Sequence, residues 1–192
     1  MRLQHELLKT VRTNNLTYER ASVLSLREYG VVIARFGFGI AWVVAAWLKW
    51  QPAFIASYGS LISGSMSGRP ALVQAWIGLW ANIVHLSPAF FAYSTASIET
   101  ALALCFILGL FTNAACIVSI ILSFLIWSIP QGFGTPYIAG QSTDIGPSFL
   151  YIFLALLLMV VGAGRYLGLD AVLTRKLGTL GFLASGTLKK TR

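Results

Sequence analysis

Four long apolar blocks constrain this chain more than any other feature of its sequence. The blocks cover residues 30–48, 89–110, 112–129 and 147–164. Each approaches the roughly 20 residues that a helix needs to cross a hydrocarbon core of about 30 Å. Because lipid offers no hydrogen bonds to the backbone, such blocks must be helical. The sequence therefore predicts an all-α, polytopic membrane protein built on a four-transmembrane-helix bundle.

The composition and the position of the blocks predict one membrane domain. Hydrophobic residues make up 57% of the 192 residues and charged residues 10%, which is more apolar than a soluble core requires. We expect this domain over residues 30–164, between an N-terminal segment (1–29) and a basic tail (165–192). Both flanking segments carry apolar residues at helical spacing, which suits either a membrane surface or a docking protein.

The positive charges indicate the orientation of the chain. The net charge is +8, but the basic residues flank the apolar blocks instead of lining one face, which argues against a nucleic-acid partner. Loop 51–88 carries one basic residue of the Lys or Arg type, Arg69, and loop 129–146 carries none. The positive-inside rule therefore predicts a multi-pass protein of the inner (plasma) membrane with both termini in the cytoplasm. The basic residues at the two ends are Arg2, Lys9, Arg12, Arg20, Arg27, Arg165, Arg175, Lys176, Lys189, Lys190 and Arg192.

The first outer loop is predicted to contain an interfacial helix over residues 71–86. Pro70 precedes this segment, and its apolar residues, such as Leu72 and Trp76, recur at helical spacing on one face. The small-residue stretch 59–68 is expected to belong to the loop that leads into it. We expect the helix to lie along the outer membrane surface.

Arg35 and Glu99 fall well inside the apolar blocks, where an ionisable group is costly enough to require a role. Glu99 lies near the middle of its block, and Arg35 lies about a turn and a half toward the cytoplasmic side of its own. A long arginine side chain can close that gap, so we expect the two to pair. The pair either links two helices, with snorkelling of Arg35 as an alternative, or forms a proton or ligand site. In the second case Glu99 and Arg35 are the candidate catalytic residues.

Five polar residues on the outer side are candidates for binding an anionic or sulfur-containing substrate. A lone histidine at a helix end also suits a cap or an interface, and Thr143 or Asp144 suits an N-cap for the helix that Pro147 opens. The five candidates are Lys49, Arg69, His85, Tyr137 and Asp144.

The sequence carries no pattern for a bound metal or a flavin. Cys105 and Cys116 form no CxxC pair and are expected to be inert packing residues. Haem, nickel and iron–sulfur patterns are also missing.

Short motifs give the chain a family resemblance over residues 30–170. The motifs are Arg35-Phe36-Gly37, Trp47-Leu48-Lys49-Trp50, Ser97-Ile98-Glu99-Thr100, Leu108-Gly109-Leu110-Phe111-Thr112-Asn113, Thr143-Asp144-Ile145-Gly146 and Gly162-Ala163-Gly164-Arg165-Tyr166-Leu167-Gly168-Leu169-Asp170. Together they resemble the DoxX/DoxD family, and residues 143–146 look closest to its DoxD branch. The resemblance implies a membrane subunit of a thiosulfate:quinone oxidoreductase, which oxidises thiosulfate to tetrathionate and passes electrons to membrane quinone. Because no cofactor pattern is present, the resemblance implies that electrons pass directly between the substrate and the quinone, through a thiol, or through a partner's cofactor.

Two functions are therefore expected to compete. The first is the membrane subunit of a quinone-linked oxidoreductase (a thiosulfate dehydrogenase) that acts on a small reduced sulfur compound such as thiosulfate, together with a DoxA-like or other redox subunit. The second is a non-catalytic membrane anchor or assembly subunit for a redox partner. A second copy of the chain is a further candidate partner. A transporter is the weakest fit, because the four blocks show no internal repeat.

Overall fold

The computed structural model describes residues 25–134 and 145–185. Over these residues the chain forms seven α-helices and two short 3₁₀-helices and no strand, which confirms the all-α class. In chain order the elements are α2 (Leu26–Lys49), α3 (Pro52–Gly64), α4 (Ala71–His85), α5 (Pro88–Leu108), α6 (Thr112–Ser128), α7 (Pro147–Val160), η1 (Ala163–Arg165), α8 (Asp170–Lys176) and η2 (Gly178–Ala184).

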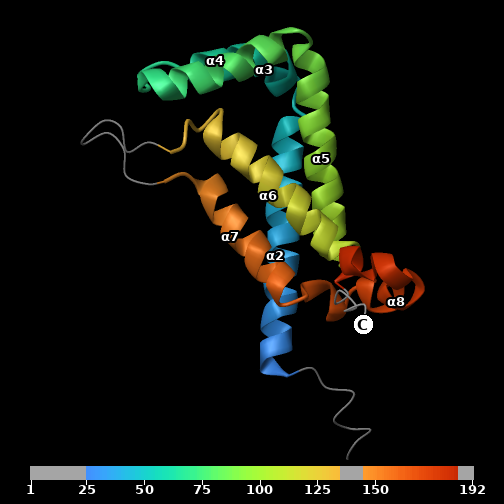
Figure 1. Cartoon of the computed structure of the whole chain (residues 1–192). Helices are drawn as coiled ribbons and strands as arrows, with labels where there is room; N and C mark the ends of the chain where they lie inside the picture. Colours follow the sequence, from blue (N-terminus) through green and yellow to red (C-terminus); the bar gives the residue numbers. More distant parts are fainter. Residues whose placement is uncertain (1–24, 135–144, 186–192) are drawn as a thin grey trace, which may run out of the picture.

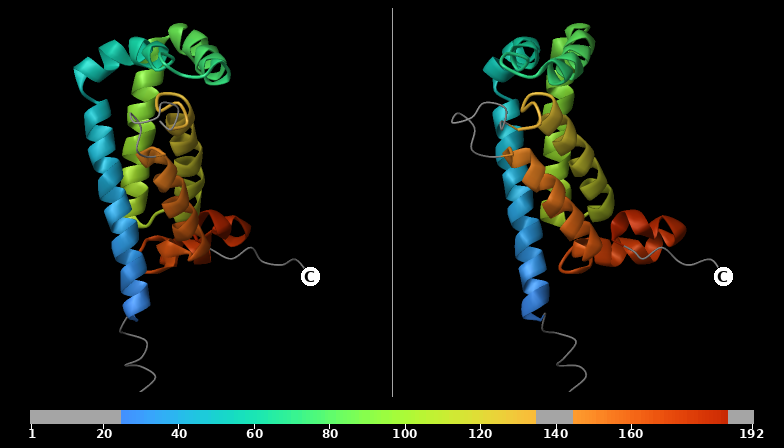
Figure 2. Two further views of the ribbon diagram at one scale, coloured as in Figure 1. Left: turned by 90° about the vertical axis from the view of Figure 1, so that its left-hand side faces the viewer. Right: turned by 60° about the vertical axis from the view of Figure 1, so that its left-hand side comes forward.

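The long helices form two pairs, and shorter helices cover both ends of the bundle (Figures 1 and 2). Helix α2 packs along α5, and α6 packs along α7, while fewer contacts join α5 to α6. Helices α3 and α4 lie across the end at which α2 terminates, and η1, α8 and η2 lie at the opposite end. We call these the α3–α4 end and the α8 end.

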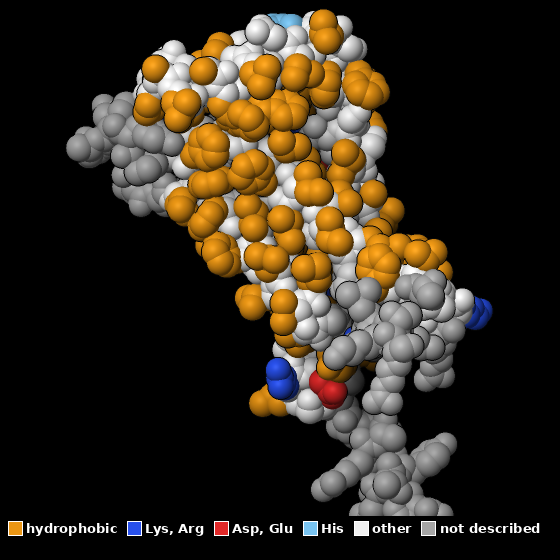
Figure 3. Space-filling view, viewed as in Figure 1, with side chains coloured by type: hydrophobic (Ala, Val, Ile, Leu, Met, Phe, Trp, Pro, Cys, Tyr) orange, Lys and Arg blue, Asp and Glu red, His pale blue; other side chains and the backbone are white. Residues whose placement is uncertain are grey.

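Two helices, α2 with 24 residues and α5 with 21, are long and apolar enough to cross a membrane. Helices α4, α6 and α7 are apolar but shorter. The expected fourth block extends to residue 164, whereas α7 ends at Val160 because the chain turns at Gly162 into η1. Apolar side chains cover the face shown in Figure 3, and the charged side chains visible on it lie toward the α8 end. This exterior suits a membrane-associated protein.

The α3–α4 end contains one helix more than the sequence suggested. Residues 59–64 were expected to be loop, but they complete α3. Pro52 starts this helix at its first position, and Ser57, Ser60 and Ser63 donate their hydroxyl hydrogens to carbonyls three or four residues earlier. Small polar residues therefore remain helical here, with Ile62 buried against α4. The segment 71–86 is helical as predicted, and the helix, α4, ends at His85.

Proline marks the start of α7, as expected, but the predicted cap is wrong. Pro147 occupies the first helical position, and the N-cap is Gly146. Asp144, one of the two residues expected to cap this helix, precedes the cap position and lies outside the described residues.

Close contact between α2 and α5 fixes the core of the bundle. A Cβ atom placed on Gly39 would lie 2.8 Å from Ile107 Cγ1 and 3.0 Å from Ile107 N, so only glycine allows the helices to approach this closely. Beside this contact Phe38 packs against the rings of Trp42 and Phe106. Cys116 belongs to the same buried cluster, and both Cys116 and Cys105 are free thiols.

Arg35 closes the α8 end of the bundle. Its guanidinium donates hydrogen bonds of 2.9–3.1 Å to the carbonyl oxygens of Ala163, Tyr166 and Leu167, and the residue is 2% exposed. These carbonyls belong to the segment 162–170 that follows α7. Arg35 therefore ties the middle of α2 to the chain beyond α7.

Asp170 completes this closure by capping α6. Its carboxylate accepts hydrogen bonds from the backbone N–H groups of Phe111 and Thr112, at 2.6 and 2.8 Å, and from the Ser185 hydroxyl. A side chain at Gly164 would collide with this carboxylate and with the Thr112 hydroxyl. A negative charge at a helix N-terminus is favourable, so Asp170 stabilises the start of α6.

The α2–α5 contact predicts opposite effects of two similar substitutions. Gly39→Ala should lower the free energy of unfolding by about 1–3 kcal/mol, because the added methyl group overpacks the contact with Ile107. Gly37→Ala should raise it by about 0.5–1 kcal/mol, because nothing lies within 4 Å of that position and alanine favours a helix. Unfolding of both variants in detergent measures the difference, and equal stabilities would contradict the observed contact.

Candidate functional site

Lys49 and Glu99 meet where α2 ends beside the middle of α5. The Lys49 ammonium nitrogen lies 3.8 Å from Glu99 Oε1, and the two side chains are 24% and 1% exposed. The other carboxylate oxygen, Oε2, is buried without a hydrogen-bond partner among the described residues. Since buried polar atoms are normally paired, this oxygen is available to a water molecule or a ligand.

The expected pair of Arg35 and Glu99 does not form. Lys49, which contacts Glu99, lies 14 residues after Arg35, or about 21 Å along α2. Arg35 is instead held by the three carbonyls at the α8 end. The predicted pair was wrong because α2 and α5 are offset along their axes. Helix α5 continues beyond Lys49 to reach α3, so Glu99 lies beside Lys49 and not beside Arg35. Of the two candidate catalytic residues, the structure brings Glu99 to the site and places Arg35 elsewhere.

A small polar cavity of about 160 Å³ adjoins the ion pair. Its walls come from all four long helices and from the residue Gln131. Four of the lining residues carry a polar atom that is buried without a hydrogen-bond partner within the described chain: Trp42 Nε1, Glu99 Oε2, Ser123 Oγ and Gln131 Oε1. The lining residues are Trp42, Ala45, Lys49, Glu99, Ser123, Ile126, Gln131, Pro147, Ser148 and Tyr151.

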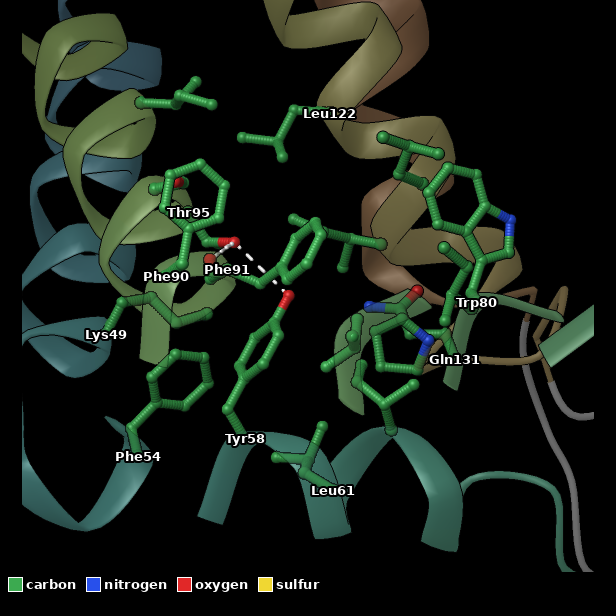
Figure 4. Close-up of a pocket in the computed structure, with 18 residues that line it drawn as sticks. Lys49, Phe54, Tyr58, Leu61, Trp80, Phe90, Phe91, Thr95, Leu122 and Gln131 are labelled. Atoms are coloured by element: carbon green, nitrogen blue, oxygen red, sulfur yellow. Dashed lines mark hydrogen bonds between the residues drawn. The ribbon is translucent and has the colours of Figure 1, made fainter. Parts of the chain in front are cut away.

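A larger cavity of about 440 Å³ lies between α5 and α6 and is closed at one end by residues of α3 and α4 (Figure 4). Most of its walls are apolar, and Phe54, Trp80, Phe90 and Phe91 contribute aromatic rings. Its polar groups include the hydroxyl of Tyr58, which lies 3.3 Å from the hydroxyl of Thr95. The other lining residues are Lys49, Leu61, Ile62, Val84, Ser94, Ile98, Leu122, Leu125, Ile126, Ile129, Pro130 and Gln131.

Lys49 and Gln131 separate the two cavities, since each lines both of them, together with Ile126. The Lys49 ammonium also lies 5.1 Å from the centre of the Phe54 ring, in the range of a cation–π contact. A single cation therefore contacts a buried carboxylate on one side and an aromatic cavity on the other.

The rim of the large cavity is apolar and exposed. Leu61, Phe90 and Ile98 line the cavity and are 41%, 64% and 39% exposed. An opening edged by such side chains favours a ligand with an apolar portion over a small ion.

The remaining predicted substrate residues do not join this site. Arg69 donates a 2.8 Å hydrogen bond to the carbonyl of Gly134, so it ties the start of α4 to the segment after α6. His85 is exposed at the end of α4, next to Gly59, which agrees with the interface alternative. Tyr137 and Asp144 lie outside the described residues.

The sequence pointed to Glu99 and Lys49 but not to most of the site. Ser123, Gln131, Ser148 and Tyr151 were missed, and so was the role of Tyr58 on α3. A weak signal existed for Ser123, because a serine in the middle of an apolar block needs a polar neighbour. Tyr58 had no such signal, because its segment was predicted to be loop.

Comparison with known proteins does not identify the chain: no protein-family model, curated protein or solved structure matches it. The resemblance to the DoxX/DoxD family stays a prediction that rests on its short motifs.

The ion pair predicts a strong dependence of Lys49 and Glu99 on each other. Lys49→Met should lower the free energy of unfolding by about 3 kcal/mol, because it leaves a buried carboxylate without a countercharge. Adding Glu99→Gln should recover most of this loss. Unfolding in detergent, with the exposed lysine variant Lys176→Met as control, tests the coupling. A double variant as unstable as Lys49→Met would show that the charges do not interact.

Proposed function

We propose that this protein is a membrane subunit of a quinone-linked oxidoreductase and that it binds the quinone headgroup in the large cavity. The observation that carries the proposal is the position of the Lys49–Glu99 pair at the wall of an aromatic cavity with an exposed apolar rim. A quinone combines a flat ring, two hydrogen-bond acceptors and an apolar tail. Each part has a matching feature in this cavity.

The residues of the cavity fit these three parts. The ring would lie among Phe54, Phe91 and Trp80, and the tail would leave past the exposed rim. Lys49 and Tyr58 carry donors that suit the two carbonyl oxygens. Reduction of a quinone consumes two electrons and two protons. Lys49, backed by the Glu99 carboxylate, is placed to hold a proton at the quinone oxygen.

We propose a small reduced sulfur compound such as thiosulfate as the electron donor. The DoxX/DoxD-like motifs around Glu99 and at residues 143–146 motivate this choice. Two thiosulfate ions would each lose one electron and join through a new sulfur–sulfur bond. The two electrons and two protons would then convert the quinone to the quinol, either directly or through a DoxA-like or other redox subunit.

The proposed setting is a bundle of four membrane spans, α2, α5, α6 and α7, with α4 and α3 at the outer surface. Helices α6 and α7 have 17 and 14 residues and are short for a hydrocarbon core of about 30 Å. At the α8 end, η1 contacts both α6 and α7, and η2 contacts α6. Irregular backbone is tolerated at membrane depth where protein covers it.

The orientation gives a direct test of this topology. In a background with Cys105 and Cys116 replaced by alanine, His85→Cys in α4 and Lys176→Cys in α8 place single exposed thiols at the two ends. A membrane-impermeant maleimide should label His85→Cys in intact cells and Lys176→Cys after permeabilisation, because the basic tails keep the α8 end in the cytoplasm. Labelling of both thiols in intact cells would contradict the proposed topology.

Quinone binding can be tested with two matched variants on α5. Ser94 lines the large cavity, whereas Ser97 is exposed and does not line it. Ser94→Phe should weaken the binding of a short-chain quinone to the protein in lipid nanodiscs by about tenfold or more, because the ring occupies the cavity. Ser97→Phe should bind like the unaltered protein.

Turnover then separates the two competing functions. Quinone reduction is measured with thiosulfate, sulfide, sulfite and small thiols, with and without candidate partners. Loss of reduction in Glu99→Gln with quinone binding retained would support a catalytic subunit. Equal binding by Ser94→Phe and Ser97→Phe would overturn the quinone site. Quinone binding without quinone reduction by any of these donors would favour the anchor function.

A further inference from the structure

The small cavity has a different chemistry from the large one. Its buried polar atoms include a donor, Trp42 Nε1, two acceptors, Glu99 Oε2 and Gln131 Oε1, and the Ser123 hydroxyl, which is both. Trp42, Glu99 and Ser123 are each 1% exposed. Leaving such groups unpaired costs free energy, and within the described residues no protein group satisfies them.

We propose that this cavity holds a cluster of water molecules that supplies protons to Glu99. Its volume of about 160 Å³ accommodates several waters, since each occupies about 30 Å³ in the liquid. Water is the ligand that fits best because it donates and accepts equally, as the mixed wall atoms require. An apolar guest would leave the same atoms unpaired.

The small cavity extends from the interior of the bundle toward its surface. It starts at buried Glu99 and Ser123 and reaches half-buried Gln131 and exposed Pro147, where α6 ends and α7 begins. Near this mouth the Gln131 side chain donates a 2.8 Å hydrogen bond to the Ser148 hydroxyl, whose own hydrogen can pass to a water. The waters therefore connect Glu99 to the α3–α4 end of the molecule.

The proton pathway rests on the proposed quinone function, while the water cluster does not. When Lys49 gives a proton to a reduced quinone oxygen, the Glu99 carboxylate takes a proton from the cluster and passes it to Lys49, which restores the ion pair. One proton enters the cavity from the α3–α4 end for each proton used. No oxidant or reductant is needed for this step.

Radiolytic footprinting of the full chain in nanodiscs tests the water cluster. Hydroxyl radicals formed from bound water oxidise the side chains next to it, even where bulk water has no access. Trp42 and Tyr151 should be oxidised about fivefold faster than buried Phe106, after correction for the intrinsic reactivity of each ring. Oxidation of Trp42 at the rate of Phe106 would show a dry cavity and overturn the proposal.

Two serines on α6 provide a matched pair of variants. Ser123 lines the cavity, whereas Ser119 is equally buried one turn earlier and lines neither cavity. Ser123→Val should lower the oxidation of Trp42 about threefold, because it removes a hydrogen-bond partner and fills space, and Ser119→Val should leave it unchanged. Ser123→Ala serves the same purpose if the valine variant does not fold. Equal effects of the Ser119 and Ser123 variants would overturn the proposal.

Quinone binding and turnover distinguish failure of the pathway from failure of the quinone site. Slower quinone reduction by Ser123→Val at unchanged quinone affinity supports the pathway. If a variant loses the oxidation of Trp42 but reduces quinone at an unchanged rate, the pathway is contradicted. Labelled Trp42 in a protein that binds no quinone supports the water cluster and refutes the proposed function instead.

Discussion

The site depends on the close packing of α2 against α5. Glycine at position 39 lets the two backbones approach at Ile107, and the same interface buries Glu99 and brings the end of α2 beside it. A carboxylate buried without a cation would be strongly unfavourable, so the register of these helices and the Lys49–Glu99 contact stabilise each other. Helix α6 adds the opposite wall of both cavities and α7 a wall of the small one, and α6 makes fewer contacts with α5 than α2 does. The space between the pairs is therefore where ligands can enter.

Arginine side chains hold the two ends of this arrangement. At the α8 end, Arg35 binds three carbonyls of the segment after α7, and Asp170 from the same segment caps α6. At the α3–α4 end, Arg69 binds the carbonyl of Gly134 and joins the start of α4 to the segment after α6. A guanidinium suits this role because it donates several hydrogen bonds from one rigid group. Two basic residues that the sequence offered as catalytic or substrate-binding candidates thus bind backbone carbonyls.

The sequence predicted the helices better than their relative positions. Apolar length located α2 and α5, and a lone carboxylate in an apolar block identified Glu99, because both signals are local. The partner of Glu99 was mistaken because the Arg35 side chain was expected to close a gap of about a turn and a half, whereas α5 extends beyond Lys49 to meet α3 and places Glu99 beside Lys49. Helix α3 itself was missed because its glycines and serines resemble a loop until packing and proline are considered. The large cavity depends on α3, so Tyr58 could not be predicted as part of the site.

Lys49 lies between an apolar cavity and a more polar one, and the two cavities favour different kinds of ligand. On the side of the large cavity, the stem of Lys49 and the Phe54 ring favour a flat apolar molecule. On the side of the small cavity, the unpaired atoms of Glu99, Trp42 and Ser123 favour water. Neither guest satisfies the opposite wall: an apolar ring leaves the carboxylate oxygen unpaired, and water gains little from the aromatic surface. A reaction that joins an apolar electron acceptor to protons from water needs both environments within reach of one group, and Lys49 lies between them.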